Sequence, residues 1–520
     1  MKKNFKNFIN NYRELDLNLT VTNSESLSSL VDHLYKKLRC DHKNVEKKKN
    51  HLKILIVNLY NNYCLDQTRF TGIYRSSNRY NTSSRYNGNN VSRGIIDIIE
   101  LLVDNGYMEY DKGVYARESS ATSYISRNKL TDKLLYLIKK YKINESAIEL
   151  LPNTECIIIQ IKDENGKRKV EYTDTESIKK YRAILTDYNN LLRESHIDIY
   201  EIPSRQGIII GKSENPVAIT QREKFVRRIF NHEGLNLGGR YYGGWWQRLS
   251  SEWRRKISIN NAPTVELDYS GVHLRILYDQ HGLSVPRGDV YDLREIGYHT
   301  IYKKYSNEEV RPVLKLLLLI MLNADSEAKA IRAFRWELQD DDNNYPTDLD
   351  IPLLISKFSQ LHYQLRDKKL FYTGVGKELA RKDSEIATDV IEHFTNKQIP
   401  ILSIHDSFII DLRHLKELKE VMEEKYKKII KPNADVKVKV PFIQKYLQMW
   451  DEKTNPYSYR IGKKVTSVSN IVVPYHMGTG EEVISMNRPL SKLGVESQKR
   501  YINFSVRDEF RRVKNYYKTH

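Results

Sequence analysis

The 520-residue sequence predicts an α+β fold divided into several domains, and three observations support this. The chain is longer than a single hydrophobic core usually serves, while its 40% of apolar residues allow ordinary packing. Amphipathic helix patterns recur along the chain. Between them lie short apolar segments that alternate as strands do and that end in turn residues.

The charge balance favours a polyanionic partner. The chain has 85 Lys and Arg against 66 Asp and Glu, a net charge of +19, and a pI near 9.4. Such a surplus suits nucleic acid, because each neutralised phosphate releases condensed counterions. A basic protein without such a partner would show the same surplus, and a coding bias toward Lys, Asn, Ile and Tyr would explain it.

Other classes of protein are disfavoured. The longest apolar stretch is interrupted by Lys315 and is shorter than the roughly 18 residues that a membrane-spanning helix needs. The basic N-terminus lacks the apolar segment of a secretory signal. Three cysteines lie far apart without the spacing of a metal site: Cys40, Cys64 and Cys156. We therefore expect neither disulfides nor zinc, and a cytoplasmic location.

The first 150 residues are expected to form two units. Residues 1–66 carry polar helix patterns. Residues 67–150 combine a helix around Ile99, ended by Asn105-Gly106, with a strand, a turn and a strand over 107–116, which is the order of a winged-helix DNA-binding domain. Four arginines of this unit are expected to contact phosphates: Arg75, Arg79, Arg85 and Arg93.

Residues 151–234 are expected to form a thumb-like or linking region. The segment starts with a hairpin over 156–172 that turns at Asn165-Gly166, the preferred pair for a tight hairpin turn. Helix patterns follow over 178–193 and 216–230.

The main domain is assigned to residues 235–450, and residues 451–520 to a basic C-terminal extension. The main domain opens with a segment rich in glycine and aromatic residues, 238–246, which includes Arg240. Such a segment can bind nucleic acid by stacking bases, or its aromatic rings can pack beneath the rest of the domain.

Three segments of the main domain carry candidate chemistry. In the first, residues 265–269 alternate as a strand does, and Ser270 is placed to cap a helix that runs to Tyr278. Asp268 then lies at the carboxyl end of the strand, where its side chain can project toward a ligand. Taken alone, an aspartate in this place is more often a turn or capping residue.

The second segment is a helix within residues 306–324. Ser306 and Glu309 have the spacing of a capping box, and Pro312 places the start of the helix near Arg311. Four residues then recur every fourth position and share one face: Arg311, Lys315, Leu319 and Asn323. Two cations on one face suit a triphosphate. A solvated helix edge, or a salt bridge to Glu308, explains them as well.

The third segment places His405-Asp406 between the apolar strands 400–404 and 407–410, and a helix over 414–430 follows. A charged pair between buried strands is hard to explain as packing, because a buried carboxylate needs a partner or a metal ion. This signal is the most specific of the three.

Together the three segments resemble the family A polymerase superfamily, which includes the DNA polymerase I-like enzymes and the single-subunit RNA polymerases of phage and mitochondria. The segments similar to its motifs A, B and C are, in that order, Asp268-Tyr269-Ser270, the helix of Arg311 and Lys315, and His405-Asp406; Asp289-Val290-Tyr291 resembles a further tripeptide. The resemblance covers residues 235–435. It implies a right-hand polymerase, with an antiparallel palm sheet and helical fingers, preceded by the helical and winged-helix-like N-terminal region.

The resemblance also implies a role for each residue. Two Mg²⁺ ions, for which Mn²⁺ can substitute, would lie about 3.5–4 Å apart between Asp268, Asp406 and the backbone carbonyl of Tyr269. The implied triphosphate contacts are Arg311 and Lys315, of which Lys315 can also protonate the leaving group, and the implied contact with the primer terminus is His405. A DNA template with its primer and dNTPs (or NTPs) are the implied partners.

Two positions depart from the DNA polymerases of the family. His273 stands where they have a glutamate that blocks a ribose 2′-OH, and Asn323 where they have a tyrosine, so we assign both to sugar selection. No segment resembles a 3′–5′ exonuclease. Asp289-Val290-Tyr291 and His405-Asp406-Ser407-Phe408 are more similar to the RNA polymerase branch, and Asp268-Tyr269-Ser270 and Leu274-Arg275 to the DNA polymerase branch. We expect a DNA polymerase without proofreading, from a phage or another mobile element. The alternatives are an RNA polymerase or primase, and a replication initiator that binds DNA without catalysis.

Overall fold

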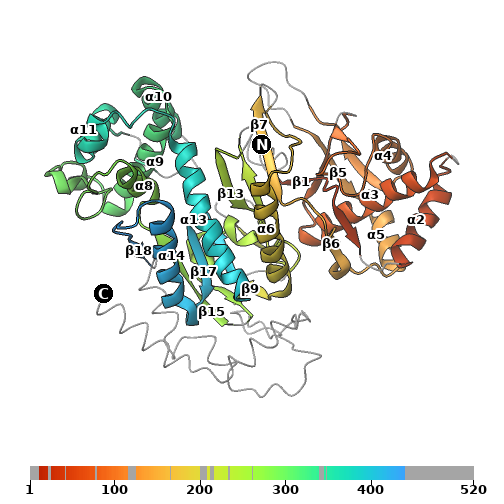
Figure 1. Ribbon diagram of the computed structural model, residues 1–520. Helices are drawn as coiled ribbons and strands as arrows, with labels where there is room; N and C mark the ends of the chain where they lie inside the picture. The colour runs from red at the N-terminus through yellow and green to blue at the C-terminus, as the bar shows by residue number, and fades with distance from the viewer. Residues whose placement is uncertain are drawn as a thin grey trace, which may run out of the picture.

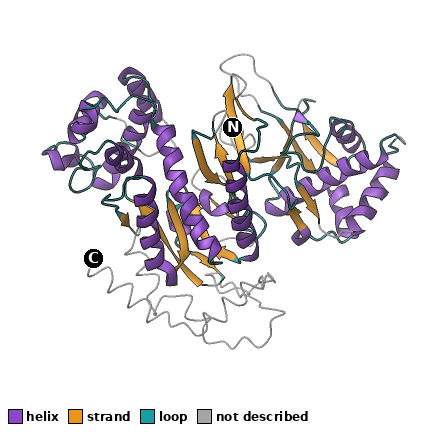
Figure 2. Ribbon diagram, in the orientation of Figure 1, coloured by secondary structure: helices purple, strands orange, loops and turns teal. Residues whose placement is uncertain are grey.

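The structure, a computed structural model, describes residues 11–439 except 22–24, 41–42, 77–78, 115–123, 164–165, 200–207, 211–215, 232–234, 261, 339–344 and 347. Within these residues the chain is a mixed α/β protein with two hydrophobic cores (Figure 1, Figure 2). One core lies between Leu19 and Ile148, and the other between Cys156 and Ala434. The predicted C-terminal extension, 451–520, lies outside the described residues.

The N-terminal core is built around a four-stranded sheet and one long helix. Its elements are β1 (Tyr12–Glu14), β2 (Leu19–Val21), α2 (Glu25–Lys37), α3 (Val45–Leu65), β3 (Phe70–Ile73), α4 (Ile95–Asp104), β4 (Met108–Asp111), β5 (Ser126–Leu130), α5 (Asp132–Lys140), η2 (Glu145–Ala147) and β6 (Ile148–Leu150). The sheet has the order β1-β3-β5-β4, with β1 parallel to β3, and β2 pairs with β6. The long helix α3 contacts α2, α4 and the sheet, so it is buried on most sides.

The predictions for this region are partly confirmed. The described part of residues 1–66 holds the helices α2 and α3 but also the strands β1 and β2, so it is helical only in part; the helix that ends at Asn105-Gly106 is confirmed as α4. The hairpin over 107–116 is wrong: β4 pairs with β5, from Met108 opposite Leu130 onward, and a bridge joins Val114 to Tyr124. The chain does not turn back near Gly113, because the pairing partner of this segment comes later in the sequence. The winged helix stays a prediction.

The described residues of the second part form two larger sheets and the two-stranded sheet β10-β11, and the first of the larger sheets has the order β13-β12-β7-β8. The elements of this part are β7 (Ile157–Asp163), β8 (Gly166–Lys169), α6 (Glu176–Glu194), β10 (Ile208–Ile210), β11 (Pro216–Ala218), β12 (Arg227–Phe230) and β13 (Gly238–Tyr242). The predicted hairpin is confirmed as β7 and β8, and the predicted helix over 178–193 as α6; the turn residues 164–165 lie outside the described residues. The predicted helix over 216–230 is wrong. β12 lies between β7 and β13, and its pairing with β7, which is distant in sequence, overrides the local helix pattern.

The second sheet is antiparallel throughout and has the order β16-β17-β15-β14-β9, with β18 paired to the end of β15. Its elements are β9 (Ile197–Ile199), η3 (Trp245–Arg248), α7 (Ser251–Arg254), β14 (Ile257–Ile259), β15 (Ala262–Tyr269), α13 (Gly376–Asn396), β16 (Ile401–Ile404), β17 (Ser407–Asp411), η7 (Leu412–His414), α14 (Leu415–Ile429) and β18 (Val438–Lys439). The long helices α13 and α14 pack against each other and against this sheet (Figure 1). Since β9 belongs to the segment 151–234, that segment shares its core with the main domain.

A group of helices lies on the other side of the sheets from the N-terminal region (Figure 1). It contains α8 (Val272–Gln280), η4 (Leu293–Ile296), η5 (Ile301–Lys303), α9 (Asn307–Asn323), α10 (Glu327–Leu338), α11 (Ile351–Leu361) and α12 (Tyr363–Asp367). The capping box of Ser306 and Glu309 is confirmed, but α9 starts at Asn307, and Pro312 lies inside the helix rather than at its start. Among the described helices, none is both long and apolar enough to cross a bilayer.

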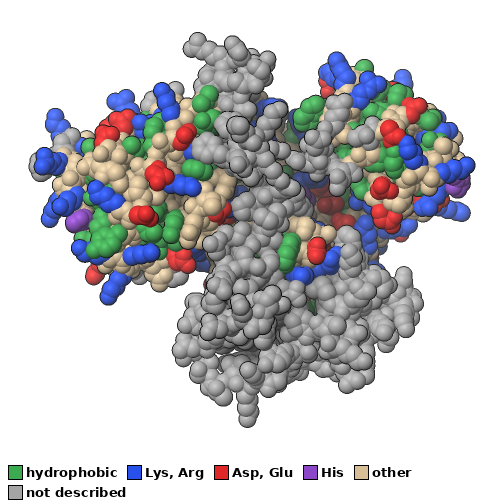
Figure 3. Space-filling view, turned by 180° about the vertical axis from the view of Figure 1, so that it is seen from behind, with side chains coloured by type: hydrophobic (Ala, Val, Ile, Leu, Met, Phe, Trp, Pro, Cys, Tyr) green, Lys and Arg blue, Asp and Glu red, His purple; other side chains and the backbone are tan. Residues whose placement is uncertain are grey.

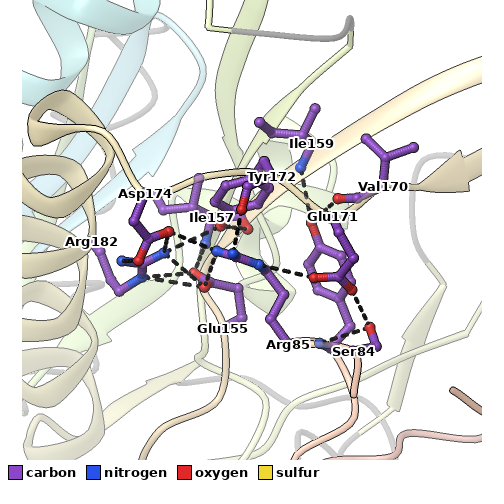
Figure 4. A network of polar contacts seen from close by, with 11 residues as sticks. Ser84, Arg85, Glu155, Ile157, Ile159, Val170, Glu171, Tyr172, Asp174 and Arg182 are labelled. Atoms are coloured by element: carbon purple, nitrogen blue, oxygen red, sulfur yellow. Dashed lines mark hydrogen bonds and ion pairs between the residues drawn. The ribbon is translucent and has the colours of Figure 1, made fainter. Parts of the chain in front are cut away.

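Arg85 joins the N-terminal region to the second core (Figure 4). Its guanidinium lies 2.8 Å from Asp174 and 3.2 Å from Glu171, and 3.7 Å above the ring of Tyr172. Arg182 of α6 binds the same Asp174 at 2.7 Å and also contacts the buried Glu155. These two guanidinium groups hold the pKa of Asp174 well below its ordinary value. Arg85 was expected to contact phosphate, whereas here carboxylates surround its guanidinium.

We therefore predict that Arg85→Ala lowers the free energy of unfolding by about 1–2 kcal/mol, because it removes charged hydrogen bonds from partly buried carboxylates. Urea unfolding measures the change. Arg79→Ala is the matched control, since Arg79 is exposed and lies over the ring of Tyr74 without an ion pair to a described residue. Equal losses in the two variants would contradict a joining role for Arg85.

Candidate active site

The pairing of β15 with β17 brings Asp268 and Asp406 together. Asp268 lies opposite Ser407, so Asp406 is the next residue along the neighbouring strand. Asp406 occupies a two-residue turn with His405, because Ile404 pairs directly with Ser407. Buried side chains on both strands keep this register, since a shift by one residue would turn every side chain to the other face.

The turn that carries Asp406 has an unusual backbone. His405 adopts a positive φ of 57°, in the left-handed region that non-glycine residues seldom occupy. The ring of His405 packs edge-on against Tyr242 of β13, with 5.3 Å between the ring centroids. Such backbone strain persists where the surrounding structure enforces it, and it is common at functional sites.

The two carboxylates lie in an environment that disfavours their charge. Burial, and next the charge of Asp406, raises the pKa of Asp268 to about 7. Burial, and next the charge of Asp383, raises the pKa of Asp406, against the opposing effects of His273 and Arg240. Positive charge placed between the two carboxylates would therefore stabilise the site.

The carboxylates fit a magnesium site by the chemistry of their donors. Hard carboxylate oxygens suit Mg²⁺, which is usually held by one or two carboxylates together with water and substrate phosphates. Across the described residues there is no cluster of three or more acidic, histidine or cysteine side chains arranged to hold a metal ion. The protein donors on offer are thus Asp268 and Asp406, with the carbonyl of Tyr269 as the expected third. The Tyr269 side chain is buried, and its hydroxyl donates to the Met422 carbonyl at 2.6 Å.

Helix α9 supplies the positive charge next to the carboxylates. The ammonium of Lys315 and the guanidinium of Arg311 both lie over the ring of Tyr291, at 5.8 and 5.1 Å from its centroid. Arg311 donates to Asp289 at 2.6 Å, so its salt bridge is to this residue and not to Glu308.

Lys315 has no such bond. Within the described part of the chain it makes no ion pair, and burial and then the charges of Arg311 and Lys439 lower its pKa, while Asp268 and Asp406 raise it. The structure thus places Lys315 within electrostatic range of both carboxylates.

Sequence reasoning missed Asp383. This residue of α13 is only 3% exposed and binds two residues that were singled out: its Oδ2 lies 2.7 Å from His273 Nε2, and its carboxylate accepts from Arg240 at 3.2 Å. Burial favours the neutral form, but the bonds from His273 and Arg240 outweigh it and hold the pKa of Asp383 below its ordinary value. A charged residue on the apolar stripe of α13, between Leu379 and Ile386, was the signal that could have revealed it.

The two residues assigned to sugar selection contact α13 at different places, His273 at Asp383 and Asn323 at Gly376. His273 contacts Asp383 and Arg240 in the interior, with 2.9 Å between Arg240 Nη2 and His273 Nε2. Asn323 is exposed at the end of α9 and packs on Gly376, where an added Cβ would lie 2.4 Å from the Asn323 Oδ1. Their roles in sugar selection stay predictions.

Ser270 does not cap α8. The residue before the helix is Gly271, at a φ of 67°, and it provides no capping side chain. Ser270 instead donates its backbone N–H to the Lys437 carbonyl at 2.9 Å, and its own carbonyl accepts from Arg275 at 2.7 Å.

The glycine-rich segment divides its aromatic residues between core and surface. Trp245 and Trp246 are fully buried, so packing beneath the domain is confirmed for them. Tyr242 is 37% exposed beside His405.

The other arginines expected to bind phosphate belong to the N-terminal region. Arg75 pairs with Glu100 at 2.8 Å, Arg79 lies over Tyr74 and Arg93 is exposed. In the view from behind, Lys and Arg side chains are spread over both outer parts of the molecule instead of forming one patch (Figure 3). Contacts of these three residues with nucleic acid stay predictions.

Comparisons with known proteins do not assign this chain to a family. No family model matches the chain, and no curated protein matches it. Among solved structures the chain is similar to the POL domain of Pol1 from M. smegmatis in complex with DNA primer-template and dNTP, with 11% identity and a TM-score of 0.22. The match covers 81% of this chain and 66% of that chain. Membership of family A thus stays a prediction, and the function is inferred below from the geometry of the site.

The raised pKa of Asp268 predicts that the metal-free protein loses stability as the pH rises from about 4 to about 7. In this window the folded state holds a proton that the unfolded carboxyl, with its ordinary pKa of 3.8, has released. The stabilising contribution of the Asp268 proton is therefore fully present below pH 3.8 and is lost as the pH rises through about 7. Urea unfolding across the window measures it. Asp268→Asn should flatten this part of the profile; an unchanged profile would contradict the assignment.

Proposed function

We propose that this chain is a metal-dependent nucleotidyltransferase that extends a nucleic-acid strand, and specifically a template-directed DNA polymerase without proofreading. The observation that carries the proposal is the pair of carboxylates, Asp268 and Asp406, on adjacent strands within electrostatic range of Lys315. Carboxylates for a divalent cation and a cation for phosphate are the two requirements of metal-assisted phosphoryl transfer.

Each group has a distinct task in this proposal. When bound, Mg²⁺ neutralises phosphate charge and activates the attacking hydroxyl. Asp268, Asp406 and the Tyr269 carbonyl would hold it. Lys315 binds triphosphate oxygens and can donate a proton to the leaving pyrophosphate, so its lowered pKa suits the transfer. Most of the catalytic effect comes from positioning and from charge stabilisation.

In this proposal Arg311 donates hydrogen bonds both to Asp289 and to a phosphate of the substrate. Asp289 accepts from Nε at 2.6 Å and from Nη2 at 3.3 Å, so the first bond is much the shorter. A phosphate that takes the Nη2 donor would leave the Nε bond in place. Asp289 thus orients the guanidinium toward the outer phosphate.

His405 and Tyr242 form the proposed contact with the primer terminus. The strained turn presents His405 next to Asp406, and the exposed Tyr242 packs against its ring. An aromatic pair at this place can stack on the terminal nucleotide.

The test is primer extension with Mg²⁺ and dNTPs. Asp406→Asn and Asp268→Asn should each reduce incorporation by at least about 10²–10³-fold, as expected for the loss of one charge-stabilising group. Asp389→Asn is the matched control, because it changes a carboxylate of α13 that pairs with the exposed Lys428. Activity that survives in both site variants would refute the metal site. Absence of activity in the wild type, with salt-sensitive DNA binding intact, would indicate a replication initiator.

RNA synthesis is the second candidate, because the predicted sugar-selecting position carries a histidine held by Asp383, and not a carboxylate. His273→Glu alone would place two carboxylates side by side, so we combine it with Asp383→Asn. We predict that the double variant lowers use of rNTPs relative to dNTPs by about tenfold, as a blocked 2′-OH would. Asp383→Asn alone is the control. If the two variants discriminate equally, His273 does not select the sugar.

A further inference from the structure

Lys439 lies in the candidate active site, although it is distant in sequence from the three motif-like segments. β18 pairs antiparallel with the end of β15, so that Lys439 is opposite Asp268 and Val438 is opposite Tyr269. Side chains of directly opposite residues in an antiparallel pair project to the same face of the sheet. The bond from the Ser270 N–H to the Lys437 carbonyl extends this pairing by one step. The position of Lys439 is thus set by the backbone.

The ammonium group of Lys439 faces the carboxylate of Asp268. Its Nζ lies 3.8 Å from Asp268 Oδ2, and the two side chains are 39% and 24% exposed. This distance is an ion pair without a close hydrogen bond, so the contact is easily exchanged for a stronger one.

Lys439 also acts on the cationic side of the site. Its charge contributes to lowering the pKa of Lys315, after burial and Arg311, and contributes to lowering the pKa of Asp289. The ammonium therefore lies 3.8 Å from Asp268 and within electrostatic range of Lys315 on α9. A triphosphate held by α9 would pass within its reach.

We propose that Lys439 is the counterion of Asp268 in the metal-free site, that a divalent cation displaces it, and that it then binds the triphosphate. This inference rests on the proposed function. Without metal, and with both aspartates ionised, two carboxylates lie near two ammonium groups, Lys439 and Lys315, and the charges cancel. Two divalent cations and the roughly four negative charges of a triphosphate cancel as well. Metal without triphosphate leaves excess positive charge, so metal and nucleotide should each promote binding of the other.

The experiment measures metal binding directly, without turnover. Mn²⁺ is titrated into protein free of nucleotide and nucleic acid, and bound and free Mn²⁺ are followed by electron paramagnetic resonance. Lys439→Met should bind Mn²⁺ about threefold to fivefold more tightly than the wild type, the range for loss of a partly exposed competing ion pair. The same variant should bind dNTP in the presence of Ca²⁺ about threefold to fivefold more weakly. Lys439→Arg should keep the nucleotide affinity.

Lys437→Met is the matched control, because it removes the same charge from the same strand segment while Lys437 makes no ion pair with a described residue. It should leave Mn²⁺ affinity unchanged, and thermal unfolding checks that every variant is folded. If Mn²⁺ affinity in Lys439→Met is unchanged or weaker, the counterion role is overturned.

Asp406→Asn separates the two levels of the proposal. Loss of Mn²⁺ binding in this variant supports the metal site, and a null result for Lys439→Met then overturns the counterion role alone. Unaltered Mn²⁺ binding in Asp406→Asn would overturn the proposed function itself.

Discussion

The site depends on one electrostatic conflict, the close approach of Asp268 and Asp406. Strand pairing enforces this approach, because β15 is paired with β17 on one side and with β14 and β18 on the other. The two carboxylates therefore cannot move apart unless hydrogen bonds between strands break. Burial and the charge of Asp406 raise the pKa of Asp268, and burial and the charge of Asp383 raise the pKa of Asp406. Positive charge near the two carboxylates stabilises their charged forms. The surrounding structure supplies some of it as side chains, and a divalent cation would supply the rest.

The positive charge reaches the site from separate parts of the fold. Helix α9 brings Lys315, and the short strand β18 brings Lys439 to Asp268. On the other side, Arg240 and His273 surround Asp383, whose charge raises the pKa of Asp406, and both residues oppose this effect. The hydrogen bonds from Arg240 and His273 therefore keep Asp383 ionised, and the charge of Asp383 acts on Asp406.

Helix α13 connects these parts. Through Asp383 it contacts both β13, which carries Arg240, and α8, which carries His273. At its start Gly376 lies so close to Asn323 of α9 that a side chain there would collide with it.

The sequence by itself determined the local elements and the candidate chemistry. Alternation located β15, β16 and β17, the capping box located α9, and the four-residue spacing placed Arg311 and Lys315 on one face. These signals are local, since side-chain period and capping depend on neighbours in sequence. Only the tertiary structure decided which distant segments meet. It made β12 a strand, placed Arg85 among carboxylates, and brought Asp383 and Lys439 to the site. Pairing between distant strands and burial of charge depend on partners that no local pattern specifies.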